Sequence, residues 1–565
     1  MKTAQKRGLE SLRHSFCKGK CLISQDPPPA RNHPVPDLTS QPVLAIMRST
    51  GEMGIASAGQ SPTRDSQSRS RQSTDPETVG SPKRIPRMLK VGLYQARYRL
   101  CDTGFNYIPP LSLGYLAAYA RQRVEGVEFF AERDLERVIE QRPDLVGITY
   151  LTHSSRNATR EARRLKEALG CPIIGGGPHI STIPKALPQE MDVGVIGEGE
   201  ATFADLLTLY KAERCFKPSS LAKVQGICYR DEQGQVCVTS PRPFIEDLDS
   251  IPIPDRAFFG KKWNDPQRVW QVMSSRGCPY DCSFCSVIAQ WGHGYRFHSA
   301  ERVVTELERI CAMGSVHLIH FDDDLFIVKR DRALAIMAAM RERGLHKGRE
   351  FTCFVRPNLL DENIMESFAR TNFTILNVGF ESGSDHALKL MNKRASSVEH
   401  NRRAVELGRK YGIRFSSCFI LGLEGETRED IIQTYQFLQE SIDVFHEIQI
   451  TPLMIFPGTP VWEKAAARYG LSENNMRGVE VEEKDFLDGK AFMLNDWPYL
   501  NDANIPREEM VGYLRMGEQV TQMVNKTLAA ARNSRHPEYV AANVPMRDIV
   551  CAKLRRRASQ ILGRE

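Results

Sequence analysis

Three cysteines stand within eight positions of one another in the stretch SSRGCPYDCSFCSV, residues 274–287. They are Cys278, Cys282 and Cys285, and the remaining cysteines are scattered along the chain. Thiolates bind soft or borderline metals, so a structural zinc ion and an iron–sulfur cluster are the two candidates. A closed zinc site needs a fourth ligand, which His293 or His298 could supply. A cubane cluster held by three cysteines instead leaves one iron open to an outside ligand, which permits chemistry.

Other residues with chemical potential each follow a short apolar run. They are Asp322, Asp323 and Asp324, then Arg356, Glu381, Gly422, Gly425, Glu426, and Pro457 with Gly458. Parallel α/β architectures bind their ligands at the carboxyl ends of the strands. We therefore expect these residues and the three cysteines to meet at one mouth.

The strands that would position these residues begin near residue 269. Candidate strands are VWQVMSS, VHLIHF, FTCFV, TILNVGF, IRFSSCFIL and FHEIQITPLMIF, each separated from the next by a helix-compatible stretch. Six such repeats predict a partial (β/α)6 TIM-type barrel over residues 263–466. A mainly helical C-terminal extension, residues 467–565, is expected to follow.

A second α/β pattern precedes the barrel. Strand-like and helix-like segments alternate over residues 89–215, which predicts a doubly wound parallel sheet. Two of its strands run into glycine turns, Gly175–Gly177 and Gly197–Gly199. Residues 216–262 are predicted to form a hairpin and a Pro-rich linker.

The ends of the chain differ from its body. Residues 1–87 are rich in Ser, Pro, Gln, Arg and Gly, and they carry the whole basic excess of the +7 net charge. Such a tail is predicted to be disordered, with Met88 as an alternative translation start. Cys17 and Cys21 form a CxxxC pair without a third ligand nearby, which argues against a metal site. A basic stretch, residues 547–562, is either a solvated terminal helix or an amphipathic surface for a membrane or nucleic acid.

Composition also limits the class of protein. The charge-balanced body gives no reason to expect a nucleic-acid partner. No stretch approaches the length of a transmembrane segment, and no secretory signal is present. The uneven cysteines in so long a chain favour reduced thiols over disulfides, which predicts a cytoplasmic protein.

The cysteine loop, CxxxCxxC with the aromatic Phe284 before the last cysteine, resembles the cluster loop of the radical S-adenosylmethionine (SAM) superfamily. The likeness continues through IHFDDDLF, VGFESGSDHALKLMNKR, FILGLEGET and FPGTP, in the order typical of members with an N-terminal cobalamin-binding domain. It covers roughly residues 89–465. The resemblance implies an oxygen-sensitive [4Fe-4S] cluster whose open iron chelates SAM. One electron then cleaves SAM to methionine and a 5′-deoxyadenosyl radical.

The resemblance also implies roles for single residues. Asp322, Asp323 and Asp324 would contact the SAM amino group, since carboxylates accept hydrogen bonds from an ammonium. Glu381 would accept a ribose hydroxyl. Gly422, Gly425 and Glu426 would let the backbone approach the cofactor closely. This chain has Glu424 where the family pattern usually has proline.

The first domain resembles the cobalamin-binding half of the same family. GGGPHISTIP and GVIGEGEATFADLL match its corrin-facing loops. Gly175, Gly176, Gly177, Gly197, Glu198 and Gly199 are therefore expected to leave room for the macrocycle, and His179 is either a corrin contact or a rim residue. The DxHxxG stretch that supplies a histidine to cobalt in other cobalamin proteins is absent. The resemblance thus implies cobalamin bound without a protein imidazole.

These observations lead to a cobalamin-dependent radical SAM methyltransferase as the leading hypothesis. Its substrate would be a small molecule or natural product methylated at an unactivated carbon or phosphorus centre, with flavodoxin or ferredoxin as electron donor. A cyclase, oxidoreductase or rearranging enzyme with the same cofactors is one alternative. A non-catalytic cobalamin- or zinc-binding sensor is the alternative of another class.

Overall fold

The computed structural model describes residues 88–96, 109–254, 256–259, 269–314, 316–473, 475–476 and 498–533. The predicted tail, with Cys17 and Cys21, and the basic stretch 547–562 lie outside these residues. Two sheets of seven and six strands carry the fold, one in each of the α/β regions expected from the sequence. None of the helices among the described residues combines the length and apolarity that crossing a bilayer requires.

The first sheet has seven strands in the order β2-β1-β3-β4-β5-β6-β7. β1 to β5 run parallel, whereas β6 and β7 are antiparallel. The strands are β1 (Leu89–Gln95), β2 (Val127–Ala131), β3 (Leu145–Thr149), β4 (Ile173–Gly176), β5 (Val193–Val195), β6 (Ile227–Arg230) and β7 (Val236–Val238). The order 2-1-3-4-5 is that of a doubly wound fold, in which β1 and β3 flank the switch point.

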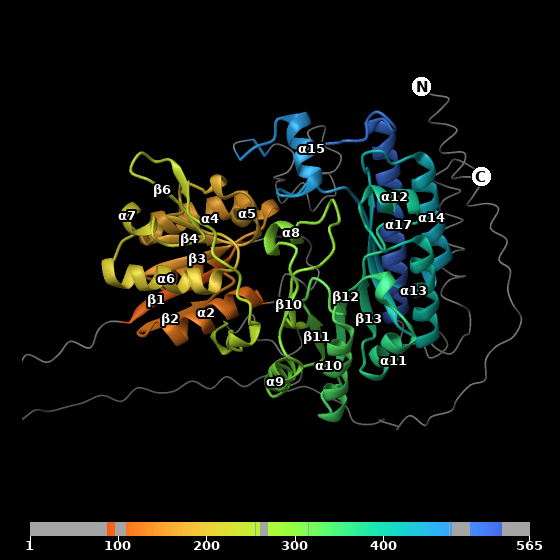
Figure 1. Ribbon diagram of the computed structural model, residues 1–565, viewed down its shortest axis with the longest axis horizontal. Helices are drawn as coiled ribbons and strands as arrows, with labels where there is room; N and C mark the ends of the chain where they lie inside the picture. The colour runs from red at the N-terminus through yellow and green to blue at the C-terminus, as the bar shows by residue number, and fades with distance from the viewer. Residues whose placement is uncertain are drawn as a thin grey trace, which may run out of the picture. The chain divides into compact units, whose positions relative to one another are not determined.

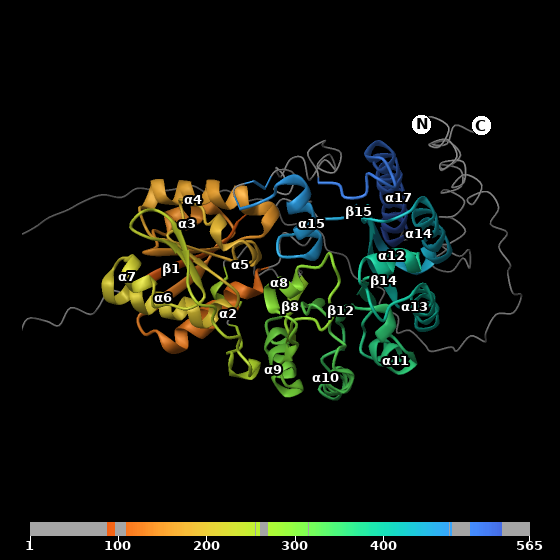
Figure 2. The ribbon, with the colours of Figure 1, turned by 45° about the horizontal axis from the view of Figure 1, so that its top comes forward.

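Helices cover both faces of this sheet. They are α2 (Leu111–Arg123), α3 (Leu135–Glu140), α4 (Ser155–Leu169), α5 (Pro178–Thr182), α6 (Gly199–Glu213) and α7 (Pro218–Leu221). Figure 2 shows α3 and α4 on one face, and α2 and α6 on the other. The predicted hairpin is β6–β7, and it extends this sheet instead of belonging to the linker, because β6 pairs with β5.

The second sheet is wholly parallel, with the order β15-β14-β13-β12-β11-β8. Its strands are β8 (Val269–Val272), β11 (Leu318–Phe321), β12 (Glu350–Val355), β13 (Ile375–Val378), β14 (Arg414–Leu421) and β15 (Phe445–Pro452). Each coincides with one of the six strands expected from the sequence, which confirms the partial barrel. A short antiparallel pair, β9 (Ser275–Arg276) and β10 (Arg296–Phe297), follows β8.

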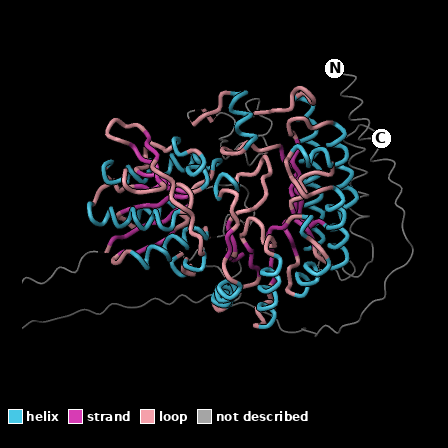
Figure 3. Tube along the Cα trace, in the orientation of Figure 1, coloured by secondary structure: helices cyan, strands magenta, loops and turns pink. Residues whose placement is uncertain are grey.

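Helices alternate with these strands, as Figures 1 and 3 show. They are α8 (Val287–Trp291), α9 (Ala300–Cys311), α10 (Arg330–Glu342), α11 (Glu362–Arg370), α12 (Asp385–Leu390), α13 (Val398–Tyr411), α14 (Arg428–Ser441) and α15 (Pro460–Tyr469). Buried phenylalanines fill the layer between sheet and helices, and Phe321, Phe351 and Phe373 are all fully buried and in ring contact. This packing fixes the strands, and with them the residues at the strand ends.

The C-terminal extension includes one long helix, α17 (Arg507–Asn533), which packs on β15. The side-chain amide of Asn525 accepts from the N–H of Ile448 at 3.1 Å and donates to the carbonyl of Ile448 at 3.0 Å. A Cβ on Gly517 would lie 2.7 Å from Ile450, so helix and strand are in close contact here. The extension therefore covers the outer strand of the barrel sheet.

Candidate active site

The three cysteines lie on the loop between β9 and α8. Gly277, which precedes Cys278, has φ of 89°, and a Cβ there would stand 2.2 Å from the carbonyl oxygen of Gly294. Only glycine fits this position. The N–H of Gly277 donates to the Asp324 carboxylate at 2.9 Å, which ties the loop to the end of β11.

Two other motifs also hold the loop. Ser283 N–H donates to the carbonyl of Met391 at 2.9 Å, and the Asn392 side chain donates to the carbonyl of Asp281 at the same distance. Val461 N–H donates to the carbonyl of Ser283 at 3.3 Å. The MNKR motif and the residue that follows FPGTP therefore contact the cysteine loop.

Burial shapes the chemistry of the three thiols. Cys282 is buried and the other two are half-buried. Burial raises the pKa of Cys278, and raises the pKa of Cys285 to about 12, with the nearby cysteines adding to the effect. Thiolates in such surroundings require positive charge, which bound iron supplies.

The arrangement of these thiols bears on the choice between zinc and a cluster. Across the described ranges, no three His, Cys, Asp or Glu side chains converge on a point that one metal ion could occupy. His298, a proposed fourth zinc ligand, instead lies with its Nδ1 3.0 Å from a carboxylate oxygen of Asp249. His293 is exposed. A tetrahedral zinc ion would need a fourth ligand beside the three cysteines, whereas a cubane needs only these three thiolates.

The three aspartates after β11 have different surroundings. Asp323 is buried and accepts from the Ser274 N–H and from the hydroxyls of Ser274 and Ser275 at 2.5–2.6 Å. It therefore anchors the segment before the cysteines, and its expected contact with SAM stays a prediction. Asp322 and Asp324 are half-buried, and no Lys or Arg within the described part of the chain pairs with them. Burial, together with the neighbouring carboxylates, raises the pKa of both. A cationic ligand beside Asp322 and Asp324 would stabilise their charged forms and lower both pKa values.

Glu381 follows β13 in a strained conformation. Its φ is 64°, in the left-handed region that costs a non-glycine residue roughly 1–2 kcal/mol. Its carboxylate pairs with the buried Lys393 at 3.2 Å. Strain of this kind is retained where the surrounding structure enforces it, often at ligand sites.

The Gly422–Glu426 turn follows β14. Gly422 and Gly425 have φ of 92° and 88°, which accounts for both glycines. The carboxylate of Glu426 is fully buried and accepts from Gly422 N–H at 2.6 Å. Glu426 thus holds the turn from its buried side, and the expected approach of this backbone to the cofactor stays a prediction. Glu424, where the family pattern has proline, is exposed and pairs with Lys464.

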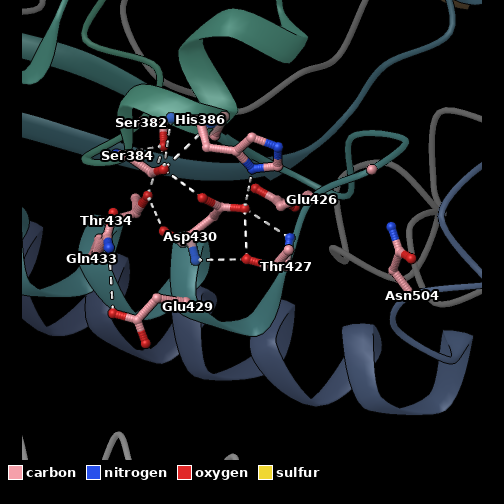
Figure 4. Close-up of polar contacts among 12 residues, drawn as sticks. Ser382, Ser384, His386, Glu426, Thr427, Glu429, Asp430, Gln433, Thr434 and Asn504 are labelled. Carbon is pink, nitrogen blue, oxygen red and sulfur yellow. Dashed lines mark hydrogen bonds and ion pairs between the residues drawn. The ribbon is translucent and has the colours of Figure 1, made fainter.

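A polar network behind this turn joins two motifs (Figure 4). Asp430 at the start of α14 accepts hydrogen bonds from Ser384 and from Thr427, and lies 2.9 Å from the Nδ1 of His386. Thr434 of the same helix bonds Ser382 at 2.8 Å. This network holds the segment after Glu381 against α14, and so fixes the turn and Glu381 relative to each other.

A cavity with an empty volume of about 1190 Å³, part of it open to solvent, lies at the carboxyl ends of β1, β3, β4 and β5. Its lining includes six residues expected to face the corrin: Gly175, Gly176, Gly177, Gly197, Glu198 and Gly199. Doubly wound folds bind ligands at this end of the sheet. Arg276, two residues before Cys278, and Trp291, six after Cys285, also line the cavity.

Glycine at this cavity serves two purposes. A Cβ on Gly176 would meet no atom within 4 Å, so a larger side chain there would take up ligand volume. Gly177 has φ of 103° and would place a Cβ 2.7 Å from the carbonyl oxygen of Tyr150, so the backbone itself requires glycine. His179 does not line the cavity. It is buried, with its Nδ1 3.3 Å from the Thr152 hydroxyl.

A buried ionic network connects this cavity with the cysteine loop. Arg276 donates to Glu198 and to Glu200, both at 2.6 Å, and Arg296 donates to Glu198 at 2.9 Å. Arg276, Glu198 and Glu200 are all under 10% exposed. The N–H of Ile245 also donates a hydrogen bond to the carboxylate of Glu198, at 2.7 Å. Glu198 therefore both lines the cavity and positions the loop that carries the cysteines, and its expected contact with the cofactor stays a prediction.

Several contributors to the site were not assigned from the sequence. Arg276, Glu200 and Lys393 carry the charged contacts described above. All three lie in or beside recognised motifs, which was the available signal. Arg356, which was expected at the mouth, contacts Cys282. Phe284 packs against an apolar cluster that includes Met391 and Leu423, so its ring supports the loop.

Comparisons with known proteins agree with this geometry. The model of the Radical SAM superfamily matches residues 272–438, and that of the B12 binding domain matches residues 100–207. An uncharacterized methyltransferase of Pyrococcus horikoshii, PH0819, is 32% identical over 384 residues, which are 65% of this chain and 81% of the relative. The anaerobic magnesium-protoporphyrin IX monomethyl ester cyclase of Rubrivivax gelatinosus is 28% identical over 351 residues, 59% of this chain and 62% of that enzyme.

A solved structure shares the fold. The radical SAM methyltransferase TsrM of Kitasatospora setae, with cobalamin and a [4Fe-4S] cluster bound, superposes with a TM-score of 0.59 at 18% identity, covering 83% of this chain and all of TsrM. The family models, the extended 32% identity and the matching fold place both domains in one architecture. The chain therefore belongs to the radical SAM superfamily, among the enzymes in which a B12-binding domain precedes the radical SAM domain.

Proposed function

We propose that this enzyme transfers a methyl group to an unactivated carbon or phosphorus centre of a small molecule, using SAM, a [4Fe-4S] cluster and cobalamin. One observation carries the proposal. The cavity of the B12-binding domain is lined by Arg276 and Trp291, which flank the cysteine loop on both sides. A methyl donor in this cavity and a radical source at the thiols would therefore share one loop. The methyltransferase relative from Pyrococcus horikoshii supports the same reaction class.

Different residues would bind the cluster and SAM. When bound, the cluster and cobalamin supply the electron that cleaves SAM and the methyl group that is transferred. Cys278, Cys282 and Cys285 would hold the irons. Asp322 and Asp324 would accept the SAM ammonium, since their raised pKa values and lack of a Lys or Arg partner within the described residues suit a cationic ligand.

The remaining groups would position SAM and leave room for the corrin. Glu381, held in its strained conformation by the polar network, would accept a ribose hydroxyl of SAM. Gly422 and Gly425 would let the backbone lie against the cofactor. Gly176 leaves room for the corrin. Holding reactants in place and excluding water are the protein's own contributions to such a reaction.

The substrate and the electron source are part of the proposal. We propose a small natural product as substrate and a flavodoxin or ferredoxin as donor of the electron. Three cysteines free of disulfides and an oxygen-labile cluster suit the reducing cytoplasm.

The test uses protein purified and reconstituted without oxygen. Incubation with SAM and a strong reductant should yield 5′-deoxyadenosine, and Cys282→Ala should abolish it because one iron loses its ligand. Cys215→Ala, at an exposed cysteine, is the matched control and should not change the yield. Persistent cleavage of SAM by Cys282→Ala would refute the radical reaction.

The outcome of the reaction needs a second measurement. With SAM deuterated in its methyl group and a small-molecule extract of cells lacking the gene, a product should gain the deuterated methyl group. A product that changes mass without gaining this label would refute methyl transfer and indicate a cyclase or another redox outcome.

A further inference from the structure

Arg356 stands directly after β12 and has its guanidinium beside the cysteine loop. Its Nη1 lies 3.5 Å from the Sγ of Cys282, and its Cζ lies 3.7 Å from the centre of the Tyr280 ring. The other terminal nitrogen donates to the carbonyl of Arg394 at 3.0 Å and to the hydroxyl of Ser396 at 3.2 Å. The contacts with Tyr280, Arg394 and Ser396 hold the guanidinium beside the thiol of Cys282.

The charge on Arg356 is unusual in its surroundings. The residue is 6% exposed. Arginine stays protonated in proteins, and a buried charge normally has an opposite charge as partner. The other buried arginines Arg256 and Arg276 pair with glutamates, but no Asp or Glu of the described ranges pairs with Arg356. The thiol of Cys282 is beside it instead, and this thiol becomes negative when it binds metal as a thiolate; the charge of Arg356 also acts on Cys278.

We propose that Arg356 is the counter-ion of the cluster thiolates and raises the reduction potential of the cluster. This inference rests on the cluster site proposed above. Reduction adds one electron, whose charge spreads over the irons and the sulfur ligands. A fixed positive charge and an N–H donor at one sulfur stabilise the reduced form more than the oxidised form. The cluster must accept an electron before SAM is cleaved, so Arg356 makes the first step easier.

The position of Arg356 separates this role from binding of SAM. Its contacts with Cys282, Tyr280 and Ser396 exist in the chain without any ligand. Its effect on the potential is therefore expected before SAM is added. An arginine that only recognised SAM would alter SAM affinity and leave the potential of the SAM-free cluster unchanged.

The experiment is a redox titration of the reconstituted enzyme, without SAM or substrate, followed by electron paramagnetic resonance of the reduced cluster. Titanium(III) citrate supplies the electrons through low-potential dyes. In Arg356→Gln, the ratio of reduced to oxidised cluster at a fixed potential should fall by about tenfold or more, which is about 59 mV for one electron. Arg356→Lys keeps the charge and should fall less.

Two further variants make the test decisive. Ser396→Ala removes one anchor of Arg356 without touching the thiols, so a smaller fall in the same direction is expected. Arg341→Gln removes a guanidinium that bonds Ser367 and Thr371 elsewhere in the barrel, and it should titrate as the wild type does. If Arg356→Gln assembles no cluster, Ser396→Ala decides between a fall and no change.

A potential in Arg356→Gln equal to that of the wild type, or an equal fall in Arg341→Gln, would overturn the proposal. The potential is measured without SAM or substrate, so an enzyme that does not transfer methyl groups would leave this inference intact. A wild-type protein that assembles no cluster and forms no 5′-deoxyadenosine would remove the proposed function and this inference together.

Discussion

The ionic network around Arg276 gives a prediction about stability that follows from burial. Arg276→Met keeps the length of the side chain and removes its charge. Glu198 would still pair with Arg296, but Glu200 would lose the only partner described for it, at a site where its side chain is 7% exposed. Leaving one partner of a buried ion pair alone costs about 3–5 kcal/mol. We expect the unfolding free energy of the chain to fall by this amount.

An exposed ion pair serves as the control for the stability cost of losing the buried one. Arg242 pairs with Asp205, whose side chain is 54% exposed, so Arg242→Met should cost at most about 1 kcal/mol. Glu200→Gln keeps an acceptor for Arg276 and should cost an intermediate amount, about 1–3 kcal/mol. The double variant of Arg276 and Glu200 should lose less than the sum of the two single variants, because the charges are removed together.

Urea unfolding of the full chain, followed by circular dichroism and tryptophan fluorescence, measures these differences. A loss below about 1 kcal/mol for Arg276→Met, equal to the surface control, would show that the network is not the buried contact described here. Strict additivity in the double variant would contradict direct coupling between Arg276 and Glu200.

Two other predictions concern the cavity and pH. Gly176→Leu should weaken binding of hydroxocobalamin, measured by equilibrium dialysis, by about tenfold or more, because its side chain would take up cavity volume. Gly512→Leu on the exposed face of α17 is the control, and equal affinities in both variants would contradict the assignment of the cavity. Burial raises the pKa of Glu426 to about 8 from an ordinary value of 4.5, so the stabilising effect of its protonated form is complete below pH 4.5 and is lost as the pH rises through 8. Glu426→Gln keeps the acceptor for Gly422, so its melting temperature should exceed that of the wild type at about pH 8.5 and match it near pH 5, and a gap that does not widen with pH would refute the reasoning.

Local patterns in the sequence were sufficient to predict much of this protein. The six barrel strands are apolar runs with strand periodicity, and the three cysteines have a spacing that few other sites share. The glycines of the cavity could be predicted because a backbone with positive φ or an approaching ligand tolerates little else. These signals depend on residues close together in the chain.

The direction of a side chain was harder to predict. Asp322, Asp323 and Asp324 were expected to contact the same cofactor group, but consecutive carboxylates have different surroundings. Asp323 accepts from Ser274 and Ser275, whereas Asp324 accepts from the N–H of Gly277. Glu198 lines the cavity as expected, but its carboxylate also pairs with Arg276, a partner 78 positions away that spacing cannot reveal.

The two outer strands of the barrel sheet both receive hydrogen bonds from side chains. Asn525 of α17 supplies a donor and an acceptor to Ile448 in β15, as the backbone of another strand would. At the opposite margin, the guanidinium of Arg256 donates to the carbonyl of Gln271 in β8 at 2.7 Å. Side chains bonded to these margins occupy backbone groups that a further strand would otherwise use. The two outer strands, β8 and β15, are therefore each bordered by a segment from outside the six repeats, the stretch before β8 and the helix after β15.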